Sequence, residues 1–151
     1  MEQVAEELAP ALERAPQIQA PVRQLEPLDG VGLVTAVSVW SYLPELGRLS
    51  RQEAAAPAGL APWVRPSGPW EGQRPIGGGR APVRQALYMA AVALARMKEN
   101  TLGKFYARRR AAGQPAKVAL TAVMRKLLLQ RNRGLKELAL ETAAQTQTNA
   151  A

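Results

Sequence analysis

The sequence predicts an all-α fold, and three observations support this. Hydrophobic residues make up 47% of the 151 residues and aromatic residues only 5%, so the core should consist mainly of Ala, Leu and Val on helices. Apolar residues recur at helical spacing in several segments. The length suits one small helical domain with an appendage, because a single core usually serves roughly 100 to 200 residues.

The N-terminal segment is expected to be an appendage. Residues 2–14 have apolar side chains at a spacing of four and glutamates on the opposite face, which is typical of an amphipathic helix. Pro10, Pro16 and Pro21 are expected to interrupt this helix, because proline lacks the amide hydrogen that an interior helical residue donates. Residues 1–24 are therefore interpreted as a helical arm or linker without a core of its own.

The domain proper is predicted to span residues 25–140 and to begin with a helix-hairpin-helix-like element. Gly30 and Gly32 stand between apolar flanks and precede a helix expected at about residues 33–43. Two glycines allow a tight turn and close approach of a DNA phosphate to the N-terminus of that helix. A plain helix-helix turn explains the same glycines equally well.

A short helix and a long Gly/Pro/Arg-rich loop come next. Ser50 and Glu53 have the spacing of a capping box, so a helix should start there and end before Pro57. Residues 58–80 then form a loop of some twenty residues, which is longer than a plain connector in a compact domain. Loops of that length are more often functional or mobile.

Three further helices complete the predicted domain. Residues 83–98 are rich in alanine and apolar nearly all round, which favours a central buried helix. A second helix, capped by Thr101, should end at Gly113, and a third should run over residues 115–134. The polar residues 141–151 are interpreted as a disordered tail.

Charge is divided unevenly along the chain. Residues 1–73 have five arginines and nine acids, a net charge of −4, whereas residues 74–151 have fifteen lysines or arginines and three acids, a net charge of +12. Nucleic acid is the first partner that such a basic half suggests, with a merely solvated cationic surface as the alternative. The candidate nucleic-acid contacts are Gly30, Gly32, Arg65, Arg74, Arg80, Arg84, Lys104 and Arg108.

Several classes of chemistry are excluded within this chain. There is no Cys and no His, which removes disulfides, the usual zinc sites and a Ser-His pair. The acids are scattered, so no metal site is predicted. The acidic N-terminus does not resemble a signal peptide, and the longest apolar run, residues 86–95, is too short to span a bilayer. We therefore expect a cytoplasmic protein without a membrane partner.

Ser67 is the candidate nucleophile of the long loop. A serine that attacks a phosphodiester needs a base to remove its proton and cations to neutralise charge on phosphorus. The cations that neutralise charge on phosphorus could be Arg65, Arg74, Arg80 and Arg84. A base or metal would have to come from another domain or chain. The alternative is an ordinary turn, for which Pro-Ser-Gly-Pro is typical.

Arg80 and Arg84 could share one phosphate. They lie four residues apart at the start of the predicted central helix, where the helix dipole also favours an anion. The glycines at 77–79 would permit close approach of the backbone, although the Lys-Ser/Thr pair of a Walker loop is missing. A flexible hinge followed by a solvated helix end is the alternative.

The blocks "LDGVGLVTA", "AGLAPWVRPSG", "GGRAPVRQALYMAA", "GKFYARRRAAG" and "KVALTAVMRKLL", in this order, resemble the C-terminal domain of transposases of insertion-sequence family 110, the DEDD transposases of bacterial mobile elements. The resemblance covers about residues 25–138. It implies that Ser67 forms a phosphoserine intermediate with DNA, while an N-terminal RuvC-like domain supplies four carboxylates for Mg²⁺. It also implies homo-oligomers on DNA, guided in some members by a structured RNA. A non-enzymatic module would instead associate with a full-length transposase.

The chain departs from the family pattern in two ways. It has Asp29 where the family usually has Pro, and it begins near the linker to the carboxylate domain. We therefore expect DNA transposition or recombination activity only when that domain is supplied in trans. The alternative functions are a non-enzymatic nucleic-acid-binding module and a decayed transposase fragment.

Overall fold

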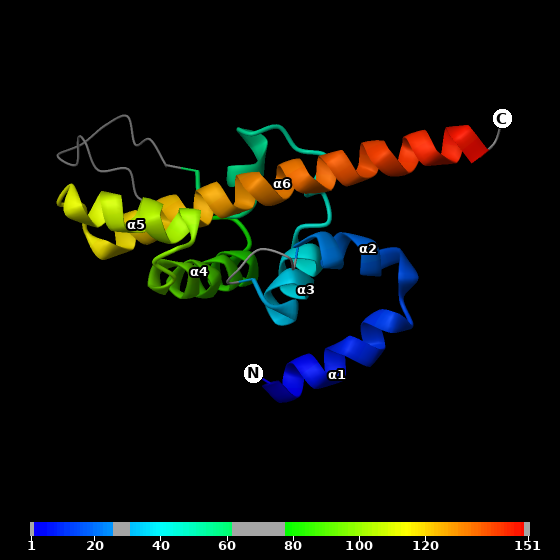
Figure 1. Ribbon diagram of the computed structural model, residues 1–151, viewed down its shortest axis with the longest axis horizontal. Coiled ribbons are helices and arrows are strands. Elements are labelled where there is room, and N and C mark those ends of the chain that lie inside the picture. The colour runs from blue at the N-terminus through cyan, green and yellow to red at the C-terminus, as the bar shows by residue number, and fades with distance from the viewer. Residues whose placement is uncertain (1, 26–30, 62–77, 150–151) are drawn as a thin grey trace.

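The computed structural model describes residues 2–25, 31–61 and 78–149, and within these ranges every regular element is helical (Figure 1). The predicted all-α fold is confirmed. The elements are α1 (Glu2–Glu13), α2 (Pro16–Leu25), α3 (Leu33–Tyr42), the short 3₁₀ helix η1 (Glu53–Ala55), α4 (Ala81–Arg96), α5 (Thr101–Ala111) and α6 (Ala116–Asn149).

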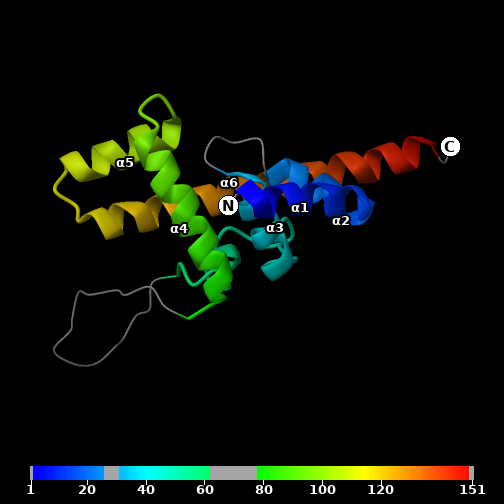
Figure 2. The same ribbon diagram turned by 90° about the horizontal axis from the view of Figure 1, so that it is seen from below.

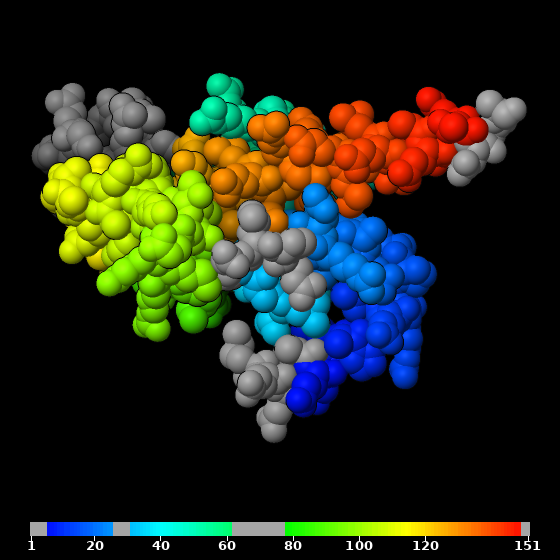
Figure 3. Space-filling model, in the orientation of Figure 1, coloured from blue at the N-terminus to red at the C-terminus, as the bar shows by residue number. Residues whose placement is uncertain are grey.

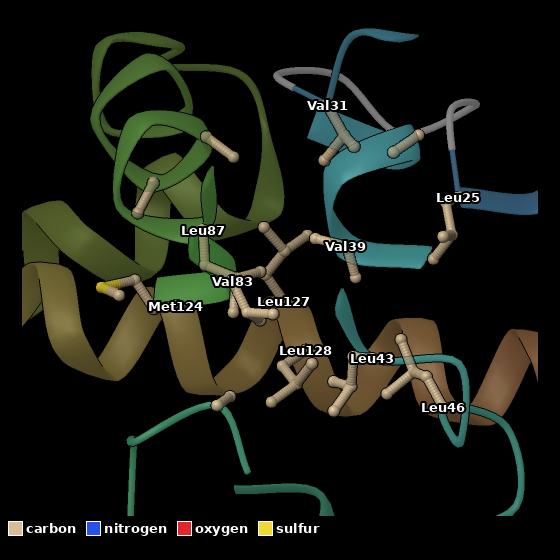
Figure 4. Packing of buried hydrophobic residues seen from close by; sticks show 14 of the residues in the cluster. Leu25, Val31, Val39, Leu43, Leu46, Val83, Leu87, Met124, Leu127 and Leu128 are labelled. Carbon is tan, nitrogen blue, oxygen red and sulfur yellow. The ribbon is translucent and has the colours of Figure 1, made fainter. Parts of the chain in front are cut away.

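Helix α6 is the spine of the fold, because α2, α4, α5 and η1 all pack against it (Figures 1 and 2). Its buried side chains recur at helical spacing: Ala119, Leu120, Val123, Met124, Leu127, Leu128 and Leu135. They meet Val83 and Leu87 of α4 and Val39 of α3 (Figure 4). Each such Leu or Val contributes roughly 1.5–3 kcal/mol by leaving water, so this aliphatic core holds the helices together without aromatic layers.

The N-terminal helices pack on the rest of the molecule (Figure 3). Leu12, Val22 and Leu25 are buried in the same hydrophobic cluster as the residues of α6. The prediction that the prolines interrupt the helix is correct at Pro16, the first residue of α2, but wrong at Pro10, which lies inside α1. Pro21 likewise lies inside α2. Packing of the apolar faces outweighs the lost hydrogen bonds.

Several predicted boundaries are confirmed. The Ser50 amide donates to Glu53 Oε2 at 2.8 Å and the Glu53 amide donates to Ser50 Oγ at 3.2 Å, which is a capping box. Gly113 has a φ of +82° just beyond α5, as expected for a glycine that ends a helix. The N-cap of α5 is Asn100 rather than Thr101: its Oδ1 accepts from the Leu102 amide at 2.8 Å.

The end of the last helix differs from the prediction. α6 continues through Gly134 to Asn149, so residues 141–149 are helical where a disordered tail was expected. A glycine inside a helix costs about 1 kcal/mol, which burial of Leu135 in the next position outweighs. The side chains of residues 142–148 are exposed, and the Thr142, Thr146 and Thr148 hydroxyls donate to carbonyls four residues earlier.

A buried amide fixes the segment between α3 and η1 on α6. Asn132 is 5% exposed; its Oδ1 accepts from the Gly47 amide at 2.8 Å and its Nδ2 donates to the Leu49 carbonyl at 2.7 Å. At Gly47, where φ is +92°, an added Cβ would lie 2.7 Å from Leu135 Cβ. Glycine is therefore required at this contact.

Candidate nucleic-acid interface

The two ends of the long predicted loop are held together at a crossing of glycines. A Cβ at Gly79 would lie 2.2 Å from the Gly59 amide nitrogen, and the Arg80 amide donates to the Pro57 carbonyl at 2.7 Å. Gly59 and Gly79 have φ values of +67° and +65°. Both glycines thus serve a backbone crossing that a side chain would block.

Three predicted site residues of this loop, Arg65, Ser67 and Arg74, lie outside the described residues. Gly30 of the predicted hairpin also lies outside them. Gly32 is the N-cap residue of α3, with a φ of −78°, and a Cβ there would meet none of the described residues within 4 Å. The packing of the described residues therefore does not itself require a glycine at residue 32.

Arg80 is the N-cap residue of α4, but its side chain turns to the end of α3. Its Nη1 forms an ion pair with Glu45 Oε1 at 2.5 Å and donates to the Tyr42 carbonyl at 3.0 Å. Arg84, one turn into α4, donates from Nη1 to the Gly78 carbonyl at 2.6 Å. The structure thus brings both arginines to the start of α4, and gives each a partner within the chain.

Lys104 and Arg108 are exposed on one face of α5. They lie beyond the C-terminal end of α4, whereas Arg80 and Arg84 lie at its N-terminal end, so the two pairs are apart (Figure 2). Lys104 Nζ lies 3.2 Å from Glu99 Oε2. That carboxylate is almost fully exposed, so the ion pair contributes little to stability.

The junction of α4 and α5 depends on Gly103. A Cβ on this residue would lie 2.0 Å from the Met97 carbonyl oxygen and 2.8 Å from that of Leu94. The first turn of α5 therefore packs directly on the last turn of α4. This contact positions the cationic surface of α5.

Sequence analysis missed two cations that lie over the Phe105 ring. The Arg109 guanidinium is 5.3 Å from the ring centroid and the Lys126 ammonium is 4.5 Å from it. Arg109 also donates from Nε to Gln114 Oε1 at 2.7 Å. The spacing of Phe105 and Arg109 could have indicated one contact; the other depends on how α5 packs against α6.

Arg131, also missed, is a buried cation. It is 7% exposed, and burial lowers the pKa of its guanidinium to about 10. Nη1 donates to the Gln24 carbonyl at 3.1 Å, while Nε and Nη2 have no partner in the part of the chain that the structure describes. This side chain links α6 to the end of α2 at a cost in desolvation.

The cationic half of the chain keeps most of its charge unneutralised. Between residues 78 and 136 there are fourteen lysines or arginines and one acid, Glu99. Among the described residues three of these cations, Arg80, Lys104 and Arg133, form ion pairs with carboxylates. The described ranges contain no group of three or more His, Cys, Asp or Glu that could hold a metal, and no helix there is long and apolar enough to cross a membrane.

These features define the class of the protein: an all-helical domain with a strongly cationic C-terminal half. A sequence profile of the Transposase IS116/IS110/IS902 family matches residues 22–107, which is more than half of the chain. The chain belongs to this family, and its function is therefore related to transposition. No curated protein matches the chain.

Proposed function

We propose that the chain is the DNA-binding C-terminal domain of an insertion-sequence transposase. The observation that carries the proposal is the charge of α4, α5 and α6: eleven of the fourteen cations between residues 78 and 136 have no carboxylate within 4.0 Å among the described residues. Such a surface suits the phosphates of DNA. The transposase family gives DNA as the polyanion that this surface would meet.

The proposal assigns Ser67 as the nucleophile of a composite active site. Its Oγ would form a bond to phosphorus while the bond from phosphorus to a deoxyribose oxygen breaks. A base supplied in trans would take the serine proton, and the departing deoxyribose oxygen would take up a proton as a free hydroxyl. One phosphoester bond replaces another, so the phosphodiester energy is retained for rejoining. The described residues of this chain do not fit a Mg²⁺ site, so Mg²⁺ would be held by a carboxylate domain supplied in trans.

DNA binding is tested by titrating labelled duplex DNA at several salt concentrations. We expect affinity to fall steeply with salt, and Arg84→Ala to weaken binding. Arg51→Ala is the matched control, because Arg51 is exposed but lies in the acidic half of the chain. Binding that does not depend on salt, or that Arg51→Ala weakens as much as Arg84→Ala, would contradict the proposal.

The hairpin hypothesis has its own variant, Gly32→Ala. Because the added methyl group meets no described residue within 4 Å, only the weaker N-cap preference of alanine applies, and the variant should lose about 0.5–1 kcal/mol of stability. A phosphate seated against the backbone would be displaced by that methyl group. Weaker DNA binding with only this small loss of stability is the expected result, and unchanged binding would favour a plain helix-helix turn.

The serine assignment is tested by covalent capture. The chain alone should not nick DNA with Mg²⁺, but together with a full-length family member it should form a protein-DNA adduct that Ser67→Ala abolishes. Nicking by the isolated chain that Ser67→Ala removes would refute the composite site. If DNA is bound but no adduct forms in any mixture, a non-enzymatic binding module becomes the better explanation.

A further inference from the structure

A groove lies between α4 and the beginning of α6. It has a volume of about 480 Å³ and is lined by Ala81, Arg84, Gln85, Tyr88, Lys117, Thr121 and Met124. The first four residues share one face of α4 and the last three share one face of α6, because they recur at three- and four-residue spacing. α4 crosses α6 and packs against it (Figure 2), and the lining residues of the groove come from these two helices.

The walls of the groove combine two kinds of chemistry. Arg84 and Lys117 bring one cation from each helix, and none of the described lining residues is an acid. Tyr88 offers an aromatic ring that is 40% exposed, and Met124, 2% exposed, forms an apolar floor at the edge of the packed core (Figure 4). Residues 83–98 were expected to form a central buried helix; one face of α4 is buried, but Tyr88 is exposed on another.

Some polar groups of the groove already form hydrogen bonds within the chain. The Thr121 hydroxyl donates to the Lys117 carbonyl at 2.9 Å, and Arg84 Nη1 donates to the Gly78 carbonyl. Among the described residues, the remaining guanidinium N–H groups of Arg84 and the ammonium of Lys117 have no hydrogen-bond acceptor, so they can bind an anion. The exposed amide of Gln85 can both donate and accept.

We propose that this groove binds one unpaired nucleotide of single-stranded DNA, an inference that rests on the proposed DNA-binding function. The phosphate would lie between Arg84 and Lys117, with the base on the Tyr88 ring above Met124. An apolar ligand alone would leave two cations desolvated without a partner, and a lone phosphate would gain nothing from Tyr88. A nucleotide matches both, because a base has an apolar stacking face beside a charged phosphate.

The position of the groove suits a protein that acts on DNA strands. The glycine crossing of Gly59 and Gly79 lies directly before Ala81, the first residue of α4 and a lining residue of the groove. The Gly78 carbonyl accepts from Arg84, a lining residue, so the described chain at Gly78 lies beside the groove. An unpaired nucleotide bound in the groove would be held beside the glycine crossing.

The test compares a labelled single-stranded DNA with a hairpin duplex of the same sequence by fluorescence anisotropy. We expect Tyr88→Leu to weaken single-strand binding about tenfold and to leave duplex binding nearly unchanged, because the leucine keeps the apolar contact and loses stacking. Lys117→Ala should weaken single-strand binding and reduce its salt slope by about one. Thermal melting checks that each variant is folded.

Matched controls exist for both variants. Tyr42→Leu removes a tyrosine that is 51% exposed on α3, and Lys136→Ala removes an exposed lysine about five turns further along α6. Both should leave single-strand binding unchanged. As an independent readout, DNA with 5-iododeoxyuridine should crosslink to Tyr88 on irradiation, and mass spectrometry would identify the peptide.

The outcomes separate this inference from the proposed function. If DNA is bound but Tyr88→Leu weakens both forms equally or neither, or if no crosslink reaches α4, the groove proposal is wrong and DNA binding stands. Tighter binding of the RNA strand of the same sequence would overturn the assignment to DNA. If neither single strand nor duplex binds, both proposals fail.

Discussion

The glycine crossing at the base of the Ser67 segment allows a sharp prediction. In Gly79→Ala the new Cβ would lie 2.2 Å from the Gly59 nitrogen and 2.7 Å from the Pro57 carbonyl oxygen, and φ at this residue is +65°. A left-handed alanine costs about 1 kcal/mol, and forcing a methyl group into packed backbone costs about 2 kcal/mol more. We expect a loss of about 3 kcal/mol in the free energy of unfolding.

Gly113→Ala is the matched control for this variant. Its φ is +82°, but an added Cβ meets nothing within 4 Å, so only the backbone term of about 1 kcal/mol applies. Urea denaturation followed by circular dichroism measures both variants. If the crossing opens locally instead, trypsin should cut after Arg80 or Arg84 faster in Gly79→Ala. Equal stability of the two variants with equal tryptic rates would refute the reasoning.

Three further predictions concern stability. Asn132→Leu keeps the branched shape and the number of heavy atoms but leaves the Gly47 amide hydrogen and the Leu49 carbonyl without partners. Urea denaturation should show a loss of about 3 kcal/mol. A loss below about 1 kcal/mol would mean that water replaces the amide. Arg131→Met removes a desolvated cation whose pKa is lowered to about 10. Each pKa unit corresponds to about 1.4 kcal/mol, so the desolvation cost that the variant removes should exceed the hydrogen bond to Gln24 that it loses. The free energy of unfolding should therefore rise by about 1–2 kcal/mol. Arg125→Met on the same helix should change stability by less than 0.5 kcal/mol, and destabilisation by Arg131→Met would reveal a partner for the guanidinium. Hydrogen bonds from Ser50 lower the pKa of Glu53, so its contribution is present above its ordinary pKa and is lost as pH falls through the folded value; Glu53→Gln should flatten the stability profile between about pH 5 and pH 3.

Local signals in the sequence predicted the elements that depend on local physics. The Ser50 and Glu53 capping box and the glycine at the end of α5 involve residues within a few positions of each other, and the structure confirms them. The start of α3 at residue 33 also agrees with the prediction. In these cases short-range hydrogen bonding or backbone preference decides the conformation.

Predictions failed where tertiary packing competes with a local preference. Gly134 was expected to end the last helix, but Leu135 is buried next to it and α6 continues. Pro10 was expected to interrupt α1, although helix packing tolerates it there. Such outcomes depend on what lies across the core, which a linear pattern does not contain.

In the candidate site, too, features that depend on neighbouring residues were predicted, and features that depend on tertiary packing were missed. Sequence reasoning placed Arg80 and Arg84 at the start of a helix, which the structure confirms, but not the ion pair of Arg80 with Glu45, thirty-five residues away. It also missed the groove, because Tyr88 and Lys117 become neighbours only when α4 crosses α6. The role of Ser67 stays a prediction, since that residue lies outside the described ranges.

Residues of the groove and residues of the core lie on one continuous helix, α6, so the number of residues between them fixes their relative orientation. Lys117, Thr121 and Met124 line the groove, while Leu127 and Leu128 on the same uninterrupted helix are buried. One residue inserted between Met124 and Leu127 would turn residues 116–124 by about 100° relative to the buried Leu127 and Leu128. Length changes in this helix are therefore far less tolerable than substitutions, and a one-residue insertion would abolish the groove where several point changes on its rim would not.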